Sequence, residues 1–307
     1  MRQKNHALMS EVAELEAILA RIPVSNVIER AGFEQRLKSA RARLGQAADV
    51  FEPERTRLTF RGLPVVGSKG ISAEFGSKAV VGFSDAFSAI IAGMKNPLNY
   101  MGPVPDKSHH QLLITGTAVG SFGFEFELPN LPANFFSESG GAEEALDKFI
   151  NLLKLSAEED DDLVTEVVAS VHPRAVRKVT SFLSYLYRNQ AWCGLEFKHG
   201  VFRYRNIEQL RRSRDRLSQN NIREDAVTYR GHIQGVLPKG RTFEFQAFDE
   251  TGILRGKVGL GIEDPDVLNR NWLHKPVEIT LDFVQVGQGR PNYTLGNLKH
   301  IRLLSQS

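Results

Sequence analysis

Two Gly-Ser-Lys triplets stand nine residues apart in residues 62–80, "GLPVVGSKGISAEFGSKAV", and come close to a phosphate-binding motif. Gly62 and Gly67 have the spacing of the phosphate loop G-x-x-x-x-G-K-[ST], but Ser68 and Lys69 stand in the opposite order. The residues that follow, "ISAEF", alternate like a strand, whereas the phosphate loop leads into a helix. These differences exclude nucleoside triphosphate hydrolysis at this motif.

The second triplet, Gly76-Ser77-Lys78, precedes a predicted helix. Free N–H groups at a helix start attract anions, and a lysine there adds positive charge. Ser77 and Lys78 are therefore candidates for binding an anion. A glycine hinge followed by a serine N-cap explains the same residues and is the favoured interpretation.

A carboxylate and a lysine also occur together in "GLEFKHG", as Glu196 and Lys198. A Glu-x-Lys strand is typical of metal-dependent nucleases of the restriction type, where the glutamate binds a metal and the lysine contacts the phosphate. The nearest acidic cluster, residues 160–162, begins a predicted helix, where acids complement the helix dipole without a metal. Nuclease activity is thus the outlying hypothesis. We expect no catalytic residues otherwise, and no metal or cofactor.

The strongest electrostatic signal lies between residues 198 and 216, where seven basic residues stand against two acidic ones, a net charge of +5. A helix is predicted from Asn206 to about Gln219, and its arginines could contact phosphates. The candidates for nucleic-acid binding are Arg203, Arg205, Arg211, Arg212, Arg214 and Arg216. The alternative is an arginine-rich helix that simply faces solvent.

Composition limits the classes of protein to be considered. The chain has 307 residues, and its net charge of +3 is too small for a protein that coats nucleic acid, so any polyanion site must be local. The single cysteine, Cys193, excludes an internal disulfide and a cysteine-rich zinc site. The sequence shows neither a signal peptide nor an apolar run long enough for a membrane span. We expect a cytoplasmic protein that does not bind membranes.

The N-terminal region, residues 1–52, has two short heptad patterns separated by Pro23. They predict an antiparallel helical hairpin over residues 4–48, a short coiled coil. Such a hairpin either folds onto the rest of the chain or associates with another copy or another protein. The candidate oligomerisation residues are Leu8, Val12, Leu15, Leu19, Leu37 and Leu44.

The rest of the chain predicts two further domains, an α+β domain over residues 53–224 and a small β-barrel over residues 225–307. In the first, strands at residues 58–60 and 71–75 precede a helix that begins at Ser77, and a strand pair, three helices, a hairpin and the basic helix follow.

In the barrel, five alternating strands with a helix after the third are typical of an oligonucleotide-binding (OB) barrel, although other small barrels leave almost the same pattern. Its outward positions are polar and partly basic, whereas its aromatic residues alternate mostly toward the interior. These outward positions are Arg230, His232, Gln234, Arg255 and Lys257.

Three segments, "ARIPVSNVIERAGFEQRL", "TGTAVGSFGFEFELP" and "GVLPKGRTFEFQAF", resemble uncharacterised bacterial proteins associated with mobile and phage-defence loci. The resemblance implies a component of a bacterial multi-protein system. We therefore expect a non-enzymatic assembly or adaptor protein that associates through its hairpin. The alternative is a protein that binds DNA or RNA through the basic helix and the barrel.

Overall fold

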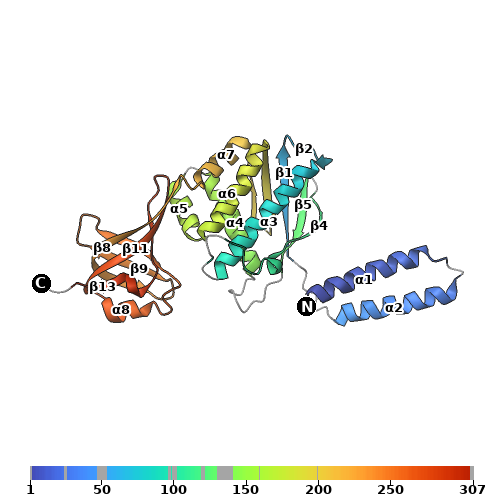
Figure 1. The fold of residues 1–307 in the computed structure, drawn as a ribbon, viewed down its shortest axis with the longest axis horizontal. Helices are drawn as coiled ribbons and strands as arrows, with labels where there is room; N and C mark the ends of the chain where they lie inside the picture. The colour runs from blue at the N-terminus through green and yellow to red at the C-terminus, as the bar shows by residue number, and fades with distance from the viewer. Residues whose placement is uncertain are drawn as a thin grey trace. The chain divides into compact units, whose positions relative to one another are not determined.

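The computed structural model describes residues 2–23, 26–46, 54–95, 98, 102–118, 122–129, 141–158, 160–198 and 200–304 (Figure 1). The chain forms two compact units, residues 1–54 and residues 55–307. The first unit is a helical hairpin. The second contains an α+β region and a β-barrel.

The hairpin consists of α1 (Arg2–Arg21) and α2 (Val27–Gln46), so the predicted helical hairpin is confirmed for the described residues; residues 47 and 48 of the predicted range lie outside them. Its turn is held by Arg30, whose guanidinium Nη1 donates to the carbonyl oxygens of Leu19 at 3.3 Å and Ile22 at 3.0 Å. Carbonyls at the end of a helix have no partner within the helix, and the arginine supplies one. Across the two helices, Arg41 pairs with Glu16 at 2.7 Å.

An antiparallel sheet forms the base of the α+β region, with the strand order β4-β5-β1-β6-β7. Its strands are β1 (Arg55–Gly62), β4 (Leu113–Thr117), β5 (Phe122–Glu127), β6 (Ala191–Phe197) and β7 (Gly200–Arg203), and a separate small hairpin pairs β2 (Val65–Val66) with β3 (Gly70–Ile71). On β1, Leu58 and Phe60 are buried on one face, while Arg55 and Arg57 are exposed on the other. The sheet therefore packs its core on one side only.

Helices cover the apolar side of this sheet (Figure 1). They are α3 (Ala73–Lys95), α4 (Gly141–Ala157), α5 (Asp161–Ala169), α6 (Pro173–Arg188) and α7 (Ile207–Arg216), with a short 3₁₀ helix η1 (Lys107–His110). Among the described helices, α3 alone is long and apolar enough to cross a membrane, but most of its apolar stretch is buried inside the protein. Its composition follows from its central place in the core, between α4 and α6.

The prediction of a strand at residues 71–75 and of a helix beginning at Ser77 was wrong. The helix α3 begins at Ala73, and its first hydrogen bond joins the Gly76 amide to the Ser72 carbonyl at 2.8 Å. Phe75 is buried against Phe60, with the ring centroids 5.5 Å apart. The alternation that suggested a strand is too short to distinguish it from the first turn of a helix, and the packing of Phe75 decides for the helix.

The C-terminal region is a closed five-stranded barrel, in which β8-β9-β10-β12-β11 form a ring and β11 returns to β8. Its elements are β8 (Ile222–Leu237), β9 (Thr242–Ala247), β10 (Ile253–Val258), α8 (Asp266–Trp272), β11 (Pro276–Val286), β12 (Asn292–Leu295), η3 (Leu298–His300) and β13 (Ile301–Leu303). The pair β10–β12 is parallel and the other pairs are antiparallel. The predicted barrel, with a helix between its third and fourth strands, is confirmed, and β13 adds a strand that was not predicted.

The strands β8 and β11 are longer than the barrel needs and pair continuously from the His232–Pro276 position to the Ile222–Val286 position. At one end, Ile222 and Val286 pack into the core of the α+β region. Further along β8, Ile233 packs into the separate core of the barrel. One two-stranded ribbon therefore belongs to both cores and joins the two regions.

Candidate functional site

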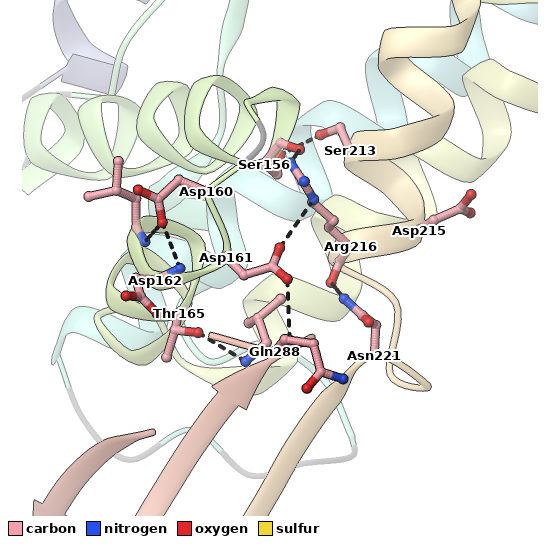
Figure 2. A network of polar contacts seen from close by, with 12 residues as sticks. Ser156, Asp160, Asp161, Asp162, Thr165, Ser213, Asp215, Arg216, Asn221 and Gln288 are labelled. Atoms are coloured by element: carbon pink, nitrogen blue, oxygen red, sulfur yellow. Dashed lines mark hydrogen bonds and ion pairs between the residues drawn. The ribbon is translucent and has the colours of Figure 1, made fainter. Parts of the chain in front are cut away.

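A polar network joins the first turn of α5 to the turn between β11 and β12 (Figure 2). Asp160 caps the helix, because its carboxylate accepts hydrogen bonds from the amides of Asp162 at 2.9 Å and Leu163 at 3.2 Å. The acidic cluster at residues 160–162, which the nuclease hypothesis considered, therefore begins a helix, as the sequence indicated.

The side chains that follow on α5 accept hydrogen bonds from the backbone of the turn. Thr165 Oγ1 accepts from the Val286 amide at 3.0 Å, and the Asp161 carboxylate accepts from the Gln288 amide at 3.2 Å. Asp162 accepts from the amide of Arg290 at 2.6 Å. These three hydrogen bonds fix the barrel on the α+β region.

Close approach in this network depends on glycine. A Cβ atom at Gly289 would lie 2.5 Å from the carbonyl oxygen of Asp161, and one at Gly287 would lie 2.4 Å from its carboxylate. From the other side, Arg216 Nε approaches the Asp161 carboxylate at 3.4 Å. We call this set of contacts the joint. Its carboxylates are used to hold the turn, and among the described residues no group of three or more His, Cys, Asp or Glu side chains is placed to hold a metal.

The basic segment is partly neutralised by ion pairs within the protein. Arg211 pairs with Glu208 at 2.9 Å and with Asp215 at 3.4 Å. Arg214 Nε donates to Asp215 at 2.8 Å, and its guanidinium lies 4.2 Å from the ring centre of Tyr187. Since Arg216 belongs to the joint, these three predicted phosphate-binding arginines of α7 all have partners in the fold.

Of the other three predicted arginines, Arg212 is exposed on α7, whereas Arg203 and Arg205 lie outside that helix. Arg203, on the edge strand β7, pairs with Glu196 on β6, and Arg205 is exposed before α7 begins. The structure therefore does not gather the basic segment into one row of available cations.

The proposed nuclease pair, Glu196 and Lys198, is not brought together. Glu196 pairs with Arg203 across β6 and β7. Lys198 follows the end of β6 with a left-handed backbone (φ 49°), and its Nζ lies 2.6 Å from the carboxylate of Glu143. The strand that a Glu-x-Lys motif requires ends at Phe197, so Glu196 and Lys198 do not project from one strand face.

The candidate anion site at Ser77 and Lys78 was predicted at the start of a helix, and the structure places it elsewhere. Both residues lie within α3, after its first turn. Ser77 Oγ donates to the Glu74 carbonyl at 3.1 Å, and Lys78 Nζ pairs with the Glu74 carboxylate at 2.7 Å. This hydrogen bond raises the pKa of Lys78. The free N–H groups that would attract an anion are not at these residues.

Of the predicted oligomerisation residues, Leu15 and Leu19 are buried within the hairpin. Val12 and Leu37 are half-buried, whereas the side chains of Leu8 and Leu44 lie outside the described part of the structure. The described apolar residues of the hairpin thus pack between its own two helices.

An exposed surface with both apolar and basic side chains lies on the outside of β8, β9 and β10, and we call it the barrel outer face. Phe248, directly after β9, is 56% exposed, and its ring lies edge-to-face with His232 at 4.9 Å between centroids. Ile253, which opens β10, is also 56% exposed and pairs with Gln246. The backbone amide of Phe248 donates to the carbonyl of Arg230, so Phe248 and Arg230 lie side by side on neighbouring segments.

Basic side chains border this apolar patch. Arg230 pairs with Glu278 at 3.0 Å, and Arg255 pairs with Glu244 at 2.9 Å. Their side chains are nevertheless 67% and 78% exposed, and Lys257 is exposed beyond Arg255 on the same face. The barrel outer face therefore combines an aromatic ring, an aliphatic side chain and several cations.

The sequence predicts the basic positions of this face, but the exposure of Phe248 was not predicted. The signal was present in "TFEFQAFDE", where Phe243, Phe245 and Ala247 alternate toward the interior. Phe248 directly follows Ala247, so its side chain must point to the opposite side of the sheet. A break in the alternation was the sign of an exposed aromatic residue.

A second polar cluster, on α4, α7 and the end of β7, is fully buried. The hydroxyls of Ser156 and Ser213 share a hydrogen bond, and Tyr204 Oη lies 2.7 Å from Ser213 Oγ. Nearby, burial raises the pKa of Cys193 to about 12. A buried thiol in this state is a poor nucleophile, so the cluster contributes to packing and offers no accessible reactive group.

Comparisons with models of protein families, with curated proteins and with solved structures give no match for this chain.

Proposed function

We propose that the protein binds single-stranded nucleic acid on the barrel outer face. The proposal is supported by the strand order of the barrel, 1-2-3-5-4, with its third and fifth strands parallel and a helix between the third and fourth, an order that favours an OB fold. In that fold, the face of strands 2 and 3 binds oligonucleotides or oligosaccharides. The corresponding strands here are β9 and β10.

The observation that carries the proposal is the exposed ring of Phe248 beside His232 on this face. An aromatic ring in solvent offers a platform on which a base can stack, and each such contact contributes about 1–3 kcal/mol. Ile253 extends the apolar surface, and Arg255 and Lys257 lie where a phosphate backbone would pass.

The ion pairs on this face do not prevent phosphate binding. An exposed pair contributes only about 0–1 kcal/mol, so Arg255 can exchange Glu244 for a phosphate at low cost. The arginines of α7 are less suitable. Arg216, for example, is 21% exposed and holds the joint.

The test is the affinity of the full-length protein for labelled single-stranded DNA and RNA oligonucleotides, measured by fluorescence anisotropy at two salt concentrations. Replacing Phe248 with alanine should weaken binding by roughly 5- to 150-fold, the equivalent of one stacked base. Leu63→Ala is the matched control, because Leu63 is an 82% exposed apolar residue in the α+β region and does not belong to the barrel outer face. Equal affinities of the wild type and the Phe248→Ala variant would refute the proposal.

Self-assembly is a second candidate, and the edge strand β4 favours it. Leu113 and Ile114 on this strand are 39% and 51% exposed, and β4 pairs only with β5 among the described residues. Exposed edges of this kind pair with other strands. Two copies joined through β4 would form one continuous sheet, consistent with the assembly role implied by the resemblance to defence-associated proteins.

Light scattering distinguishes the routes to assembly. Pairing through β4 predicts a mass of twice 34.3 kDa that Ile114→Lys reduces to the monomer, while Leu63→Lys, at an 82% exposed position, leaves it unchanged. Deletion of residues 1–50 should also leave the dimer intact. Loss of the dimer in that deletion would instead favour association through the hairpin.

A further inference from the structure

The charges on the barrel outer face are separated along the hairpin of β9 and β10. Phe248 is followed in the connecting turn by Asp249 and Glu250, both exposed. The Asp249 carboxylate accepts from the Thr251 amide at 2.9 Å, which fixes its position. Hydrogen bonds from the Thr251 side chain and amide lower the pKa of Asp249, so it carries a negative charge at neutral pH. The end of the face next to Phe248 is thus acidic.

The opposite end of the same face is basic. The strand register places Arg255 opposite Glu244 and Lys257 opposite Thr242, successively further from the acidic turn. Lys239, in the turn between β8 and β9, adds an exposed cation at this end. Arg230, beside Phe248, is matched by Glu278 on β11, so this one cation stands against three carboxylates and the Phe248 end remains net negative.

We propose that this face binds the end of a nucleic-acid strand, specifically an end that carries a hydroxyl group and no phosphate. The proposal rests on the proposed function. The terminal base stacks on Phe248, and the backbone leads away over Arg255 and Lys257. A strand that continued past Phe248 would bring its next phosphate toward Asp249 and Glu250. The negative charges of the phosphate and of the two carboxylates repel each other, so continuation of the strand past Phe248 is disfavoured.

The turn between β11 and β12, which belongs to the joint, also restricts how long a bound strand can be. In OB barrels the loop between strands 4 and 5 often contributes to ligand binding. Here that loop, residues 287–291, is held by Asp161 and Asp162 on α5. It is not available to guide a longer strand, which leaves the β9 and β10 surface as the main contact.

The experiment is a competition assay with the full-length protein and a labelled reference oligonucleotide. The unlabelled competitors share one sequence and are linear with two hydroxyl ends, linear with a 5′ or a 3′ phosphate, or circular. The linear strand with hydroxyl ends should compete about three- to tenfold better than the circle. A phosphate on the end that binds, which is either the 5′ or the 3′ end, should reduce competition by a similar factor.

The double variant Asp249→Asn, Glu250→Gln should abolish this discrimination and bind all the competitors about equally. The asparagine side chain retains an oxygen that can accept from the Thr251 amide, so the turn is preserved, and an unchanged urea midpoint checks the fold. If the circular and linear strands compete equally with the wild type, end recognition is refuted while nucleic-acid binding stands. If no oligonucleotide binds, both proposals fail.

Discussion

The close contacts of the joint predict that replacing Gly289 with alanine destabilises the protein. No positive φ is required of this residue, so alanine is compatible with its backbone. The added Cβ, however, would lie 2.5 Å from the carbonyl oxygen and 2.7 Å from the carbonyl carbon of Asp161. Both atoms belong to the backbone of α5, so they cannot move aside as a flexible side chain would. Either the first turn of the helix or the β11–β12 turn has to shift.

The size of the effect follows from what the shift disrupts. Overpacking a close contact costs about 1–3 kcal/mol. Displacing the turn also weakens its hydrogen bonds to Asp161 and Thr165, each contributing about 1 kcal/mol. We expect Gly289→Ala to lower the free energy of unfolding by about 2–4 kcal/mol.

Urea titration followed by circular dichroism measures the loss, and amide hydrogen exchange locates it. Exchange should accelerate at Val286 and Gln288, whose amides bond to α5. The control is Gly235→Ala, because a Cβ there meets no atom within 4 Å and no positive φ is involved. That variant should be unchanged, or stabilised by up to about 1 kcal/mol. If Gly289→Ala unfolds at the wild-type urea concentration, close approach at the joint is not required for stability.

Three further predictions concern the α+β region. Cys193 is buried with its pKa raised to about 12, so a maleimide should label it only as fast as the protein unfolds, and rapid labelling at pH 8 in the absence of urea would contradict its burial. Burial opposes ionisation of Asp85, but Lys107 and Lys178 outweigh it and lower its pKa; its stabilising contribution is therefore present above pH 3.8 and lost as the pH falls through the lowered value. Asp85→Asn should accordingly flatten the dependence of the urea midpoint on pH below about 4, and an unaltered profile would disprove the pairing. Ser213→Ala removes the hydroxyl that lies 2.7 Å from the buried Tyr204 hydroxyl and should cost about 1–3 kcal/mol in urea titrations, while equal midpoints would show that Ser156 satisfies Tyr204 by itself.

Much of the fold follows from periodicity in the sequence. Alternation and helical spacing predict the hairpin, the strand pairs, the helices and a five-stranded barrel with its helix, because burial of one face imposes a period on each element. A patterned stretch that is too short does not distinguish a strand from a helix. The residues Ile71 to Phe75 fit both a strand and a helix, and only the packing of Phe75 on Phe60 separates the two.

The candidate site follows from the sequence much less well, because a local charge count does not show which charges meet. Arg216 is one of several arginines in the basic segment, yet it meets Asp161, which lies 55 positions earlier in the chain. Likewise, Arg255 and Glu244 meet only because β9 and β10 pair in one register.

By itself, then, the sequence determined the type and order of most elements, since these depend on neighbours within a few positions. The tertiary structure alone decided which side chains are available for binding. Availability depends on partners that strand register and helix packing bring from distant parts of the chain. For that reason our proposed binding site lies at the exposed ring of Phe248 and not at the arginines of α7.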